Sequence, residues 1–385
     1  MNLQLHRNAD SIRETSMTGH PEEVRRIHRT HAYSGAQVDG KSRSHWGVAF
    51  LTVSFALRGA FLNMALPYGD PLDEPFHYGY AAYVEAAGRP PRAAEVSMPA
   101  EALHALAWLP RSEALPGAHV SWKAFDSMSA KEQAERFREA FHFDRSRREA
   151  FVTPNLEAQQ PTLAYIPAAA VLRFFGIATL DRRLLALRLL ATLLSSLAVP
   201  LAHAFFRRLL SRRGALAATT AFVAFPGVGS FVGRFTNDAL ALPIVAAILV
   251  VLADLARGHF PRRRAVLLAV LLAGGCWAKL YVLLLLPAAP VVALFAPRNR
   301  RVEVFRRAVT SCTAALLLVI PWFTRQHADS GDWLGLGPSK QAVHMGVGLL
   351  DRLHALPDLF RFRFAIVFGR SFLWPGTWSA MGAPA

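Results

Sequence analysis

Two adjacent carboxylates and a nearby histidine, Asp73, Glu74 and His77, form the group of residues in this chain best suited to chemistry. They follow the first apolar run that is long enough to cross a bilayer. Ionisable groups beside hydrocarbon are costly and usually serve a function, and a carboxylate placed there can act as a general base on a hydroxyl. A structural explanation competes, because Asp followed by Glu and Pro75 also makes a good helix N-terminus.

The composition indicates the setting in which these residues act. Of the 385 residues, 53% are hydrophobic, and the formal net charge is +16; the mean hydropathy is +0.24. Soluble domains average about 45–50% apolar residues, so an integral membrane protein is predicted. The arginines occur in short blocks between apolar runs, which is typical of cytoplasmic loops. These blocks are Arg207-Arg208, Arg212-Arg213, Arg262 to Arg264, Arg298 to Arg301 and Arg306-Arg307.

The same placement argues against two other classes of protein. A nucleic-acid-binding surface would combine basic residues with interleaved aromatic ones, whereas here the charge lies at the ends of apolar runs, so no nucleic-acid partner is expected. Cys276 and Cys312 both lie within apolar runs. We interpret them as small buried hydrophobic residues and not as a disulfide or a metal site.

The charge pattern also predicts the topology of the first part of the chain. Residues 1–45 are polar and carry several arginines, and we expect them to form a disordered cytoplasmic tail. The run from Trp46 to Leu66 then crosses the membrane, which leaves the long segment 67–183 on the extracytoplasmic side. Within that segment, 162–180 is apolar but is expected to lie along the membrane surface as a juxtamembrane helix. If it crossed, every later arginine block would lie on the wrong side.

The rest of the chain completes the prediction of an all-α integral membrane protein with about seven transmembrane helices and a long first extracytoplasmic loop that carries juxtamembrane helices. The run Ala265 to Ala296 has arginine blocks at both ends, so we expect two short helices that turn near Lys279. Residues 46–325 form the predicted membrane module, and 326–385 an extracytoplasmic or juxtamembrane segment. The further spans are expected at Leu184–Phe206, Ala215–Val232, Leu240–Leu255 and Ala308–Phe323.

This topology gathers polar side chains at the outer ends of the helices. They are Asp73, Glu74, His77, Gln159, Gln160, Tyr165, Arg234, Asp238, Lys279 and Arg325. Carboxylates facing cations suit transfer of a group from a lipid phosphate, because the cations stabilise the leaving phosphate and an acid removes the proton of an acceptor hydroxyl. Singly, each has a simpler explanation: Asp238 could cap a helix, and Lys279 and Arg325 could extend toward lipid headgroups.

Several motifs, in their order along the chain, resemble those of the GT-C superfamily of integral-membrane glycosyltransferases. The likeness is to bacterial relatives of the protein O-mannosyltransferases and of the aminoarabinose transferase that modifies lipid A, over about residues 46–325. The motifs are Leu72–His77, Gln159–Tyr165, Leu187–Leu190, Thr236–Leu240, Ala278–Leu280 and Pro321-Trp322. The second Pro and second Tyr of the family's loop motif are here Thr162 and Ala164. Family members usually have further spans, so the chain is expected to be a fragment, a truncated product or a minimal member.

The resemblance implies a glycosyltransferase of the bacterial inner membrane. Its donor would be a polyprenyl-phosphate-linked sugar, and its acceptor a hydroxyl of a lipid, glycan or protein at the extracytoplasmic face. In that reaction Asp73 is the catalytic base, and Glu74, the other member of the catalytic pair, positions the acceptor or a divalent ion together with Asp238. Metal use differs among superfamily members, and the sequence leaves it open. A divalent ion would draw its ligands from Asp73, Glu74, His77 and Asp238.

A second set of residues is assigned to substrate binding by the same resemblance. Lys279 and Arg325 would hold the donor phosphate, together with Arg234. The whole set is His77, Gln160, Tyr165, Arg234, Asp238, Lys279 and Arg325.

Non-enzymatic functions remain as alternatives. The chain could be a transporter, an assembly partner for envelope polysaccharide, or a degenerate family member that binds a lipid-linked sugar without transferring it. A transporter is expected to show internal repeats and helices broken by Gly or Pro at mid-membrane. The sequence shows no internal repeat, and its polar residues are predicted to lie at one surface, which favours the enzyme.

Overall fold

The computed structural model of the chain describes residues 45–66, 68–69, 73–92, 94–111, 120–143, 150–176, 179–331 and 333. The predicted tail 1–45 lies outside the described residues apart from its last one, and so does most of the predicted segment 326–385. By internal contacts the chain divides into Met1–Phe50 and Leu51–Ala385. Of the first unit, the structure describes only the start of a helix, His45–Ala65, and the fold below is that of the second unit.

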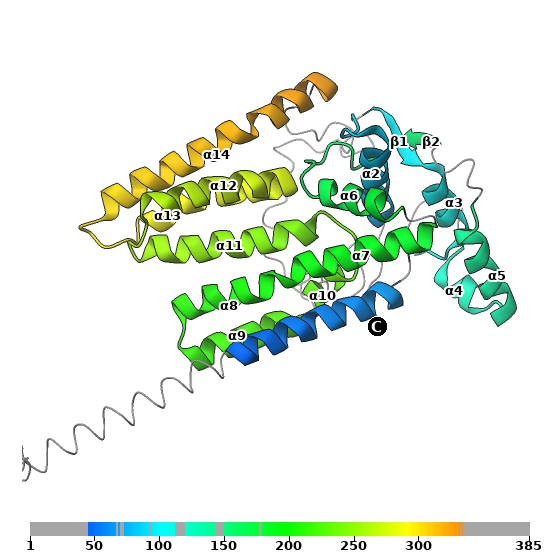
Figure 1. The fold of residues 1–385 in the computed structure, drawn as a ribbon, viewed down its shortest axis with the longest axis horizontal. Helices are drawn as coiled ribbons and strands as arrows, with labels where there is room; N and C mark the ends of the chain where they lie inside the picture. The colour runs from blue at the N-terminus through cyan, green and yellow to red at the C-terminus, as the bar shows by residue number, and fades with distance from the viewer. Residues whose placement is uncertain are drawn as a thin grey trace, which may run out of the picture. The chain divides into compact units, whose positions relative to one another are not determined.

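Among the described residues, four helices are long and apolar enough to cross a membrane. They are His45–Ala65, Leu180–Leu209, α11 (Asp238–Ala256) and α14 (Arg301–Ser330). The second of these comprises α7 (Leu180–Ser196) and α8 (Ala198–Leu209), which meet at Leu197. Helices α8, α11, α12 and α14 pack in that order, each against the next (Figure 1). The protein is therefore a helical membrane protein, as the composition predicts.

The other apolar runs form shorter helices. Residues 215–232 are divided between α9 (Arg212–Ala224) and α10 (Pro226–Val232), because a proline has no backbone N–H with which to continue the preceding helix. The chain of 265–296 forms α12 (Arg262–Ala278), then reverses through the 3₁₀-helix η2 (Leu280–Leu285) and α13 (Ala288–Ala293). All of these are shorter than the roughly 20 residues that a crossing needs. By length, the described helices thus account for four of the seven expected spans.

The break between α9 and α10 is held by an arginine of the first helix. Arg58 donates from Nη1 to the carbonyl oxygen of Val223 at 2.6 Å and from Nη2 to that of Phe225 at 3.2 Å. Val223 lies in the last turn of α9, where a helix leaves carbonyl groups without an intrahelical partner. Gly229 makes room for the guanidinium, since a Cβ at that position would lie 1.8 Å from Nη2.

The segment predicted to be the first extracytoplasmic loop has secondary structure of its own. It contains α2 (Glu74–Ala87), β1 (Val96–Pro99), α3 (Ala100–Trp108), α4 (Trp122–Asp126), α5 (Ala130–Phe141), β2 (Phe151–Pro154) and α6 (Tyr165–Phe175). β1 and β2 form a two-stranded antiparallel sheet in which Val96 is opposite Pro154 and Pro99 is opposite Phe151. The all-α prediction omitted this sheet, because its strands are short and lie far apart in the sequence, so no local pattern links them.

The folded loop shares a hydrophobic core with membrane helix α7. The rings of Tyr80 on α2 and Tyr165 on α6 stack with their centroids 3.8 Å apart, and both side chains are fully buried. They belong to a core that also includes Leu172 of α6 and Leu187 of α7. Helix α6 has 11 residues, which corresponds to about 16 Å. It occupies the middle of the apolar segment 162–180.

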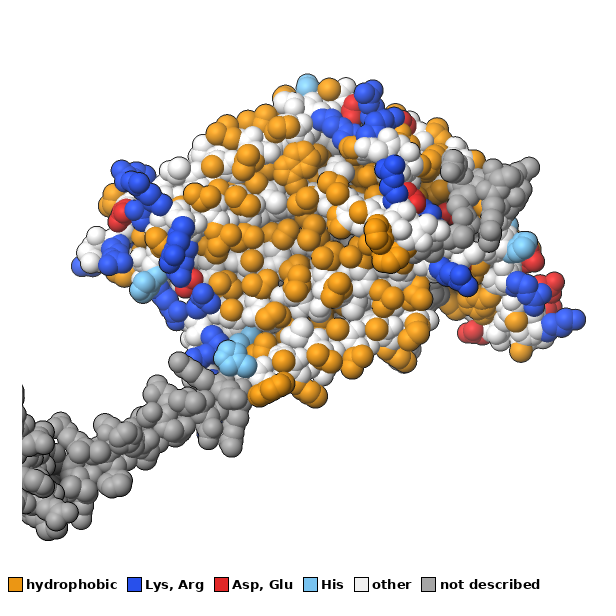
Figure 2. All heavy atoms as spheres, viewed as in Figure 1, with side chains coloured by type: hydrophobic (Ala, Val, Ile, Leu, Met, Phe, Trp, Pro, Cys, Tyr) orange, Lys and Arg blue, Asp and Glu red, His pale blue; other side chains and the backbone are white. Residues whose placement is uncertain are grey.

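The membrane helices have two chemically different ends. α11 begins at Asp238 and ends at Ala256, and its 19 residues separate these ends by about 28 Å. Near its C-terminal end, Asp254 pairs with Arg208 at 2.7 Å and with Arg264 at 3.1 Å. Figure 2 shows a largely hydrophobic face over α8, α11, α12 and α14, with lysines and arginines gathered where α8 meets α9 and α11 meets α12. We call this end, with Arg207 to Arg213, Arg257 to Arg264 and Arg298 to Arg307, the arginine end.

Candidate functional site

An ion pair lies at the end of α11 opposite the arginine end. Lys279 Nζ is 2.7 Å from Asp238 Oδ2, and Tyr281 donates its hydroxyl proton to Asp238 Oδ1 at 3.2 Å. Asp238 opens α11, while Lys279 is the residue after α12 and has an extended backbone (φ −154°, ψ 127°). The reversal between α12 and η2 thus places an ammonium group against a carboxylate at the start of the neighbouring helix.

Asp73 joins this pair from the residue before α2. It occupies the N-cap position, but its carboxylate makes no capping hydrogen bond, so the structural explanation offered for it is not what the geometry shows. The pKa of Asp73 is raised by burial; Lys279 opposes this shift, and the carboxylate of Asp238 adds to it. The acid therefore lies within electrostatic reach of both members of the pair.

Glu157 is a further acid of the same cluster, which the sequence analysis missed. Burial raises its pKa to about 7; the neighbouring carboxylates of Asp73 and Asp238 add to the rise, and Lys279 opposes it. Glu157 lies after β2 and shortly before Gln160, whose backbone N–H donates to the carbonyl oxygen of Glu157 at 2.8 Å. The sequence signal that could have identified Glu157 is the position of its carboxylate, just before the Gln159–Tyr165 motif.

His77 and Tyr165 form the wall beside Glu157. His77 Nδ1 lies 2.7 Å from the hydroxyl of Tyr165 and 4.0 Å from Glu157 Oε2. Burial lowers the pKa of His77 well below its usual value, and Lys279 lowers it further, so the imidazole is neutral at neutral pH. Gln160 Oε1 accepts a hydrogen bond from Asn237 Nδ2 at 3.3 Å, next to Asp238. We call Asp73, His77, Glu157, Gln160, Tyr165, Asp238, Lys279 and Tyr281 the acidic cluster.

Glu74 occupies a different place from its neighbour Asp73. Its carboxylate is fully buried and accepts from Arg188 Nε at 2.7 Å and Nη2 at 2.5 Å. It also accepts from the backbone N–H of Phe235 at 3.0 Å. Arg188 in turn donates to the carbonyl oxygens of Asn63 and Leu66, each at 2.7 Å. This network joins α2 to α7, to the end of the first helix and to the segment before α11.

The two remaining predicted cations are Arg325 and Arg234. Arg325 Nη2 donates to the carbonyl oxygens of Pro90 and Pro91, at 3.2 and 2.9 Å, and its Nε lies 3.4 Å from Asp329. It therefore fastens the end of α14 to the chain that follows α2. Arg234 is buried, with 4% of its surface exposed, and directly precedes Phe235, whose N–H binds Glu74.

Of the predicted site residues, the structure thus brings six together and gives Glu74 and Arg325 separate contacts. The six are Asp73, His77, Gln160, Tyr165, Asp238 and Lys279. Within the described part of the chain, no group of three or more His, Cys, Asp or Glu side chains is placed to hold a metal ion. The metal ligands expected from the sequence were Asp73, Glu74, His77 and Asp238. Of these, Glu74 uses its carboxylate oxygens to accept hydrogen bonds from Arg188 and Phe235.

The fold and the acidic cluster define a class: a helical membrane protein in which acids and a lysine meet where the membrane helices adjoin a folded loop. Residues 162–324 match the family model described as dolichyl-phosphate-mannose-protein mannosyltransferase. Over these residues, which are less than half of the chain, the expected resemblance to this GT-C type of glycosyltransferase is confirmed. The matched residues include Tyr165, Asp238 and Lys279, while Asp73 and Glu157 lie before them. No curated protein and no solved structure matches the chain.

Proposed function

We propose that the protein transfers a sugar from a polyprenyl-phosphate donor to a hydroxyl of an envelope acceptor, such as a lipid, glycan or protein. The observation that carries this proposal is the acidic cluster, in which Asp73 lies within electrostatic reach of the Lys279–Asp238 pair. The family match supports a membrane glycosyltransferase. The nature of donor and acceptor is the one that the resemblance to the GT-C glycosyltransferases implies, and carboxylates facing a lysine suit that chemistry.

Asp73 is the general base of the proposed reaction. Its carboxylate takes the proton of the acceptor hydroxyl, and the acceptor oxygen forms a bond to the anomeric carbon of the sugar. The bond from that carbon to the phosphate oxygen breaks, and the phosphate leaves with the electron pair. Attack from the face opposite the phosphate inverts the configuration of the sugar carbon.

Lys279 binds the phosphate that leaves. An ammonium group has three N–H donors, and the 2.7 Å contact with Asp238 uses one of them. The other two can donate charge-assisted hydrogen bonds to phosphate oxygens. Asp238 and Tyr281 hold Lys279 in place, and His77, Gln160 and Tyr165 line the substrate side. Arg325 and Glu74 have no role in the reaction proposed here, because Arg325 donates to the carbonyl oxygens of Pro90 and Pro91 and Glu74 is paired with Arg188.

The proposed active face is extracytoplasmic. The acidic cluster and the arginine end lie at opposite ends of α11, and arginine-rich loops are retained in the cytoplasm. This orientation also puts the N-terminus in the cytoplasm, makes 162–180 a juxtamembrane segment, and fits a bacterial inner membrane protein. In the proposed topology α9–α10 and the α12–α13 hairpin complete seven spans, with short arms accommodated by local thinning of the bilayer.

The test is transfer of a labelled sugar from polyprenyl-phosphate donors to acceptors in membranes that contain the full chain. Asp73→Asn keeps the size and the capping ability of the residue but removes the base, so activity should fall by about 10²–10⁴-fold. Asp126→Asn, an exposed residue of α4, is the matched control and should retain activity. Transfer by the Asp73→Asn protein at close to the parent rate would refute the mechanism.

Binding separates the enzyme from its non-enzymatic alternatives. Lys279→Met should weaken binding of the polyprenyl-phosphate sugar while the protein stays folded, because the ammonium that contacts the phosphate is gone. A parent protein that binds this donor but transfers nothing would be a degenerate binder. One that does not bind it at all would leave the transporter and assembly-partner functions.

A further inference from the structure

A cavity lined by arginines opens at the arginine end, away from the acidic cluster. Its volume is about 340 Å³, and it lies where the connection between α11 and α12 faces the start of α14. That volume falls within the range of small-ligand sites. The ionisable side chains that line it are His259, Arg263, Arg264, Arg300, Glu303 and Arg307. Four guanidinium groups therefore face one carboxylate.

Two of the arginines build the walls of the cavity. Arg264 is 3.1 Å from Asp254 and donates to the carbonyl oxygen of His259 at 2.7 Å. Arg307 is 2.5 Å from Glu303 and donates to the carbonyl oxygen of Phe260 at 2.7 Å. These contacts compensate both charges and fix α12 and α14 to the connecting loop.

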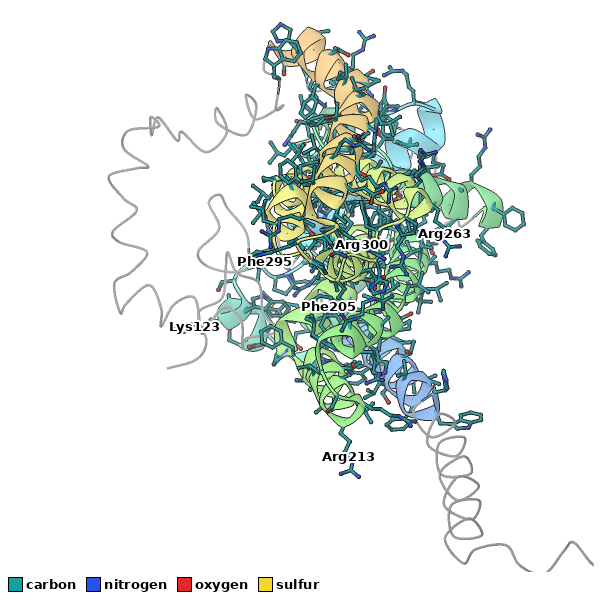
Figure 3. The ribbon with its side chains drawn as sticks, turned by 90° about the vertical axis from the view of Figure 1, so that its left-hand side faces the viewer. Lys123, Phe205, Arg213, Arg263, Phe295 and Arg300 are labelled. Carbon is teal, nitrogen blue, oxygen red and sulfur yellow. The ribbon has the colours of Figure 1, made fainter. Side chains whose placement is uncertain are left out.

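The other two arginines supply uncompensated positive charge. Arg300 makes a 3.4 Å contact with the carbonyl oxygen of Gly258. Arg263 is exposed, and no hydrogen bond or ion pair to any described residue is shown for it. Figure 3 looks onto this end of the molecule and labels both side chains. Two guanidinium groups at one cavity, without acids to neutralise them, form a site for an anion.

The surroundings of the cavity indicate what carries the anion. Val302 and Phe305 on α14 and Val266 on α12 are apolar residues whose exposed fractions are 82%, 38% and 64%. They follow directly on the arginines at the start of helices whose outer surface is hydrophobic. An anion with attached hydrocarbon satisfies both features, because its charge meets the arginines and its chains cover the apolar side chains.

We propose that this cavity binds the phosphate of an anionic phospholipid headgroup through Arg263 and Arg300. Basic pockets between membrane helices at the cytoplasmic side are suited to such headgroups. The site is separate from the acidic cluster, and its existence does not depend on the proposed sugar transfer.

The test measures binding of phosphatidylglycerol and of phosphatidylcholine to the full chain in neutral detergent, by native mass spectrometry. Arg263→Gln with Arg300→Gln removes the proposed ligands. Arg212→Gln with Arg213→Gln is the matched control, since these arginines at the start of α9 lie outside the cavity lining. Both double variants lose two charges, so general attraction to anionic lipid falls equally. Only the cavity variant should lose phosphate hydrogen bonds, which weakens phosphatidylglycerol binding by a further tenfold or more.

Three results would overturn the proposal. Equal weakening in the two double variants would indicate diffuse attraction to the arginine end. Equal binding of phosphatidylcholine and phosphatidylglycerol by the parent would show that the net charge of the lipid is not recognised. Displacement of phosphatidylglycerol by glycerol phosphate at equal concentration would assign the site to a soluble phosphate compound. Melting temperatures without lipid check folding, and the single change Arg263→Gln, at an exposed residue, serves if the double variant is unstable.

Discussion

Three carboxylates, those of Asp73, Glu157 and Asp238, share the neighbourhood of the Lys279 ammonium group. Carboxylates this close and this buried do not all ionise at neutral pH, because each negative charge raises the cost of the next. The strongest effect falls on Glu157, whose pKa rises to about 7. At neutral pH Glu157 is therefore protonated in part of the molecules.

The raised pKa of Glu157 predicts a pH dependence of stability. Between its ordinary value of 4.5 and about 7, the folded protein holds a proton on Glu157 that the unfolded chain releases. The free energy of unfolding therefore falls as the pH rises through this window. In Glu157→Gln the side chain cannot titrate, so the apparent melting temperature should fall less steeply between pH 4.5 and 7.

A matched variant separates this effect from the titration of other groups. Glu135→Gln, at an exposed position of α5, should keep the slope of the parent protein. His77, Asp73 and Asp238 still face the cluster in Glu157→Gln, and burial raises the pKa of Asp73 as well, so a shallower slope remains. Identical slopes in Glu157→Gln and the parent would contradict the assignment.

At the scale of elements, the buried pair of Glu74 and Arg188 holds the folded loop to the membrane helices. The pair and its hydrogen bonds to Asn63, Leu66 and Phe235 connect four parts of the chain. Removing one partner of such a pair leaves a buried charge uncompensated, which costs far more than the pair itself contributes.

We therefore expect Glu74→Gln to destabilise the protein by about 3–5 kcal/mol. Arg188 loses its carboxylate partner in this variant but remains buried. The measurement is unfolding of the purified protein in detergent, followed by loss of helical signal. Glu135→Gln is again the control, because exposed substitutions away from such contacts change stability by no more than about 0.5 kcal/mol. A Glu74→Gln protein as stable as this control would mean that the pair is dispensable for the fold.

Local sequence patterns predicted the helices better than they predicted the contacts between distant segments. Hydropathy located the long helices, and the isolation of Lys279 between arginine blocks located the reversal after α12. The proline at 226 was visible in the sequence, but the break it makes within the expected span was not predicted. The pairing of β1 with β2 and of Glu74 with Arg188 joins residues far apart in sequence, and nothing in either segment specifies its partner. For the same reason Asp73 and Glu74 were assigned to one catalytic pair, although one faces the cluster and the other a buried arginine.

At the scale of the whole molecule, the separation of the arginine end from the acidic cluster determines the predicted orientation in the membrane. Figure 3 labels Arg213 at the start of α9 and Lys123 on α4, and both side chains are exposed. They belong to the arginine end and to the predicted extracytoplasmic loop, respectively.

Single cysteines at these two positions should therefore react from opposite sides. In a background where Cys276 and Cys312 are replaced by alanine, Lys123→Cys should react with a membrane-impermeant maleimide on intact cells. Arg213→Cys should react only after the membrane is permeabilised. The two changes remove the same charge, so each controls for the other. Reaction of both from the same side would refute the orientation and move the proposed active site to the other face.

The ion pair between Glu74 and Arg188 also constrains the order in which parts of the chain can fold during biosynthesis. The two residues are 114 positions apart, and at 5–20 residues per second a ribosome needs roughly 6–23 s to add that length. During this interval the newly made Glu74 lacks the guanidinium that permits its burial, so α2 cannot settle into its final place. Asp73, the residue before it, therefore also reaches its final position later. We therefore expect the acidic cluster to assemble only after α7 has been synthesised.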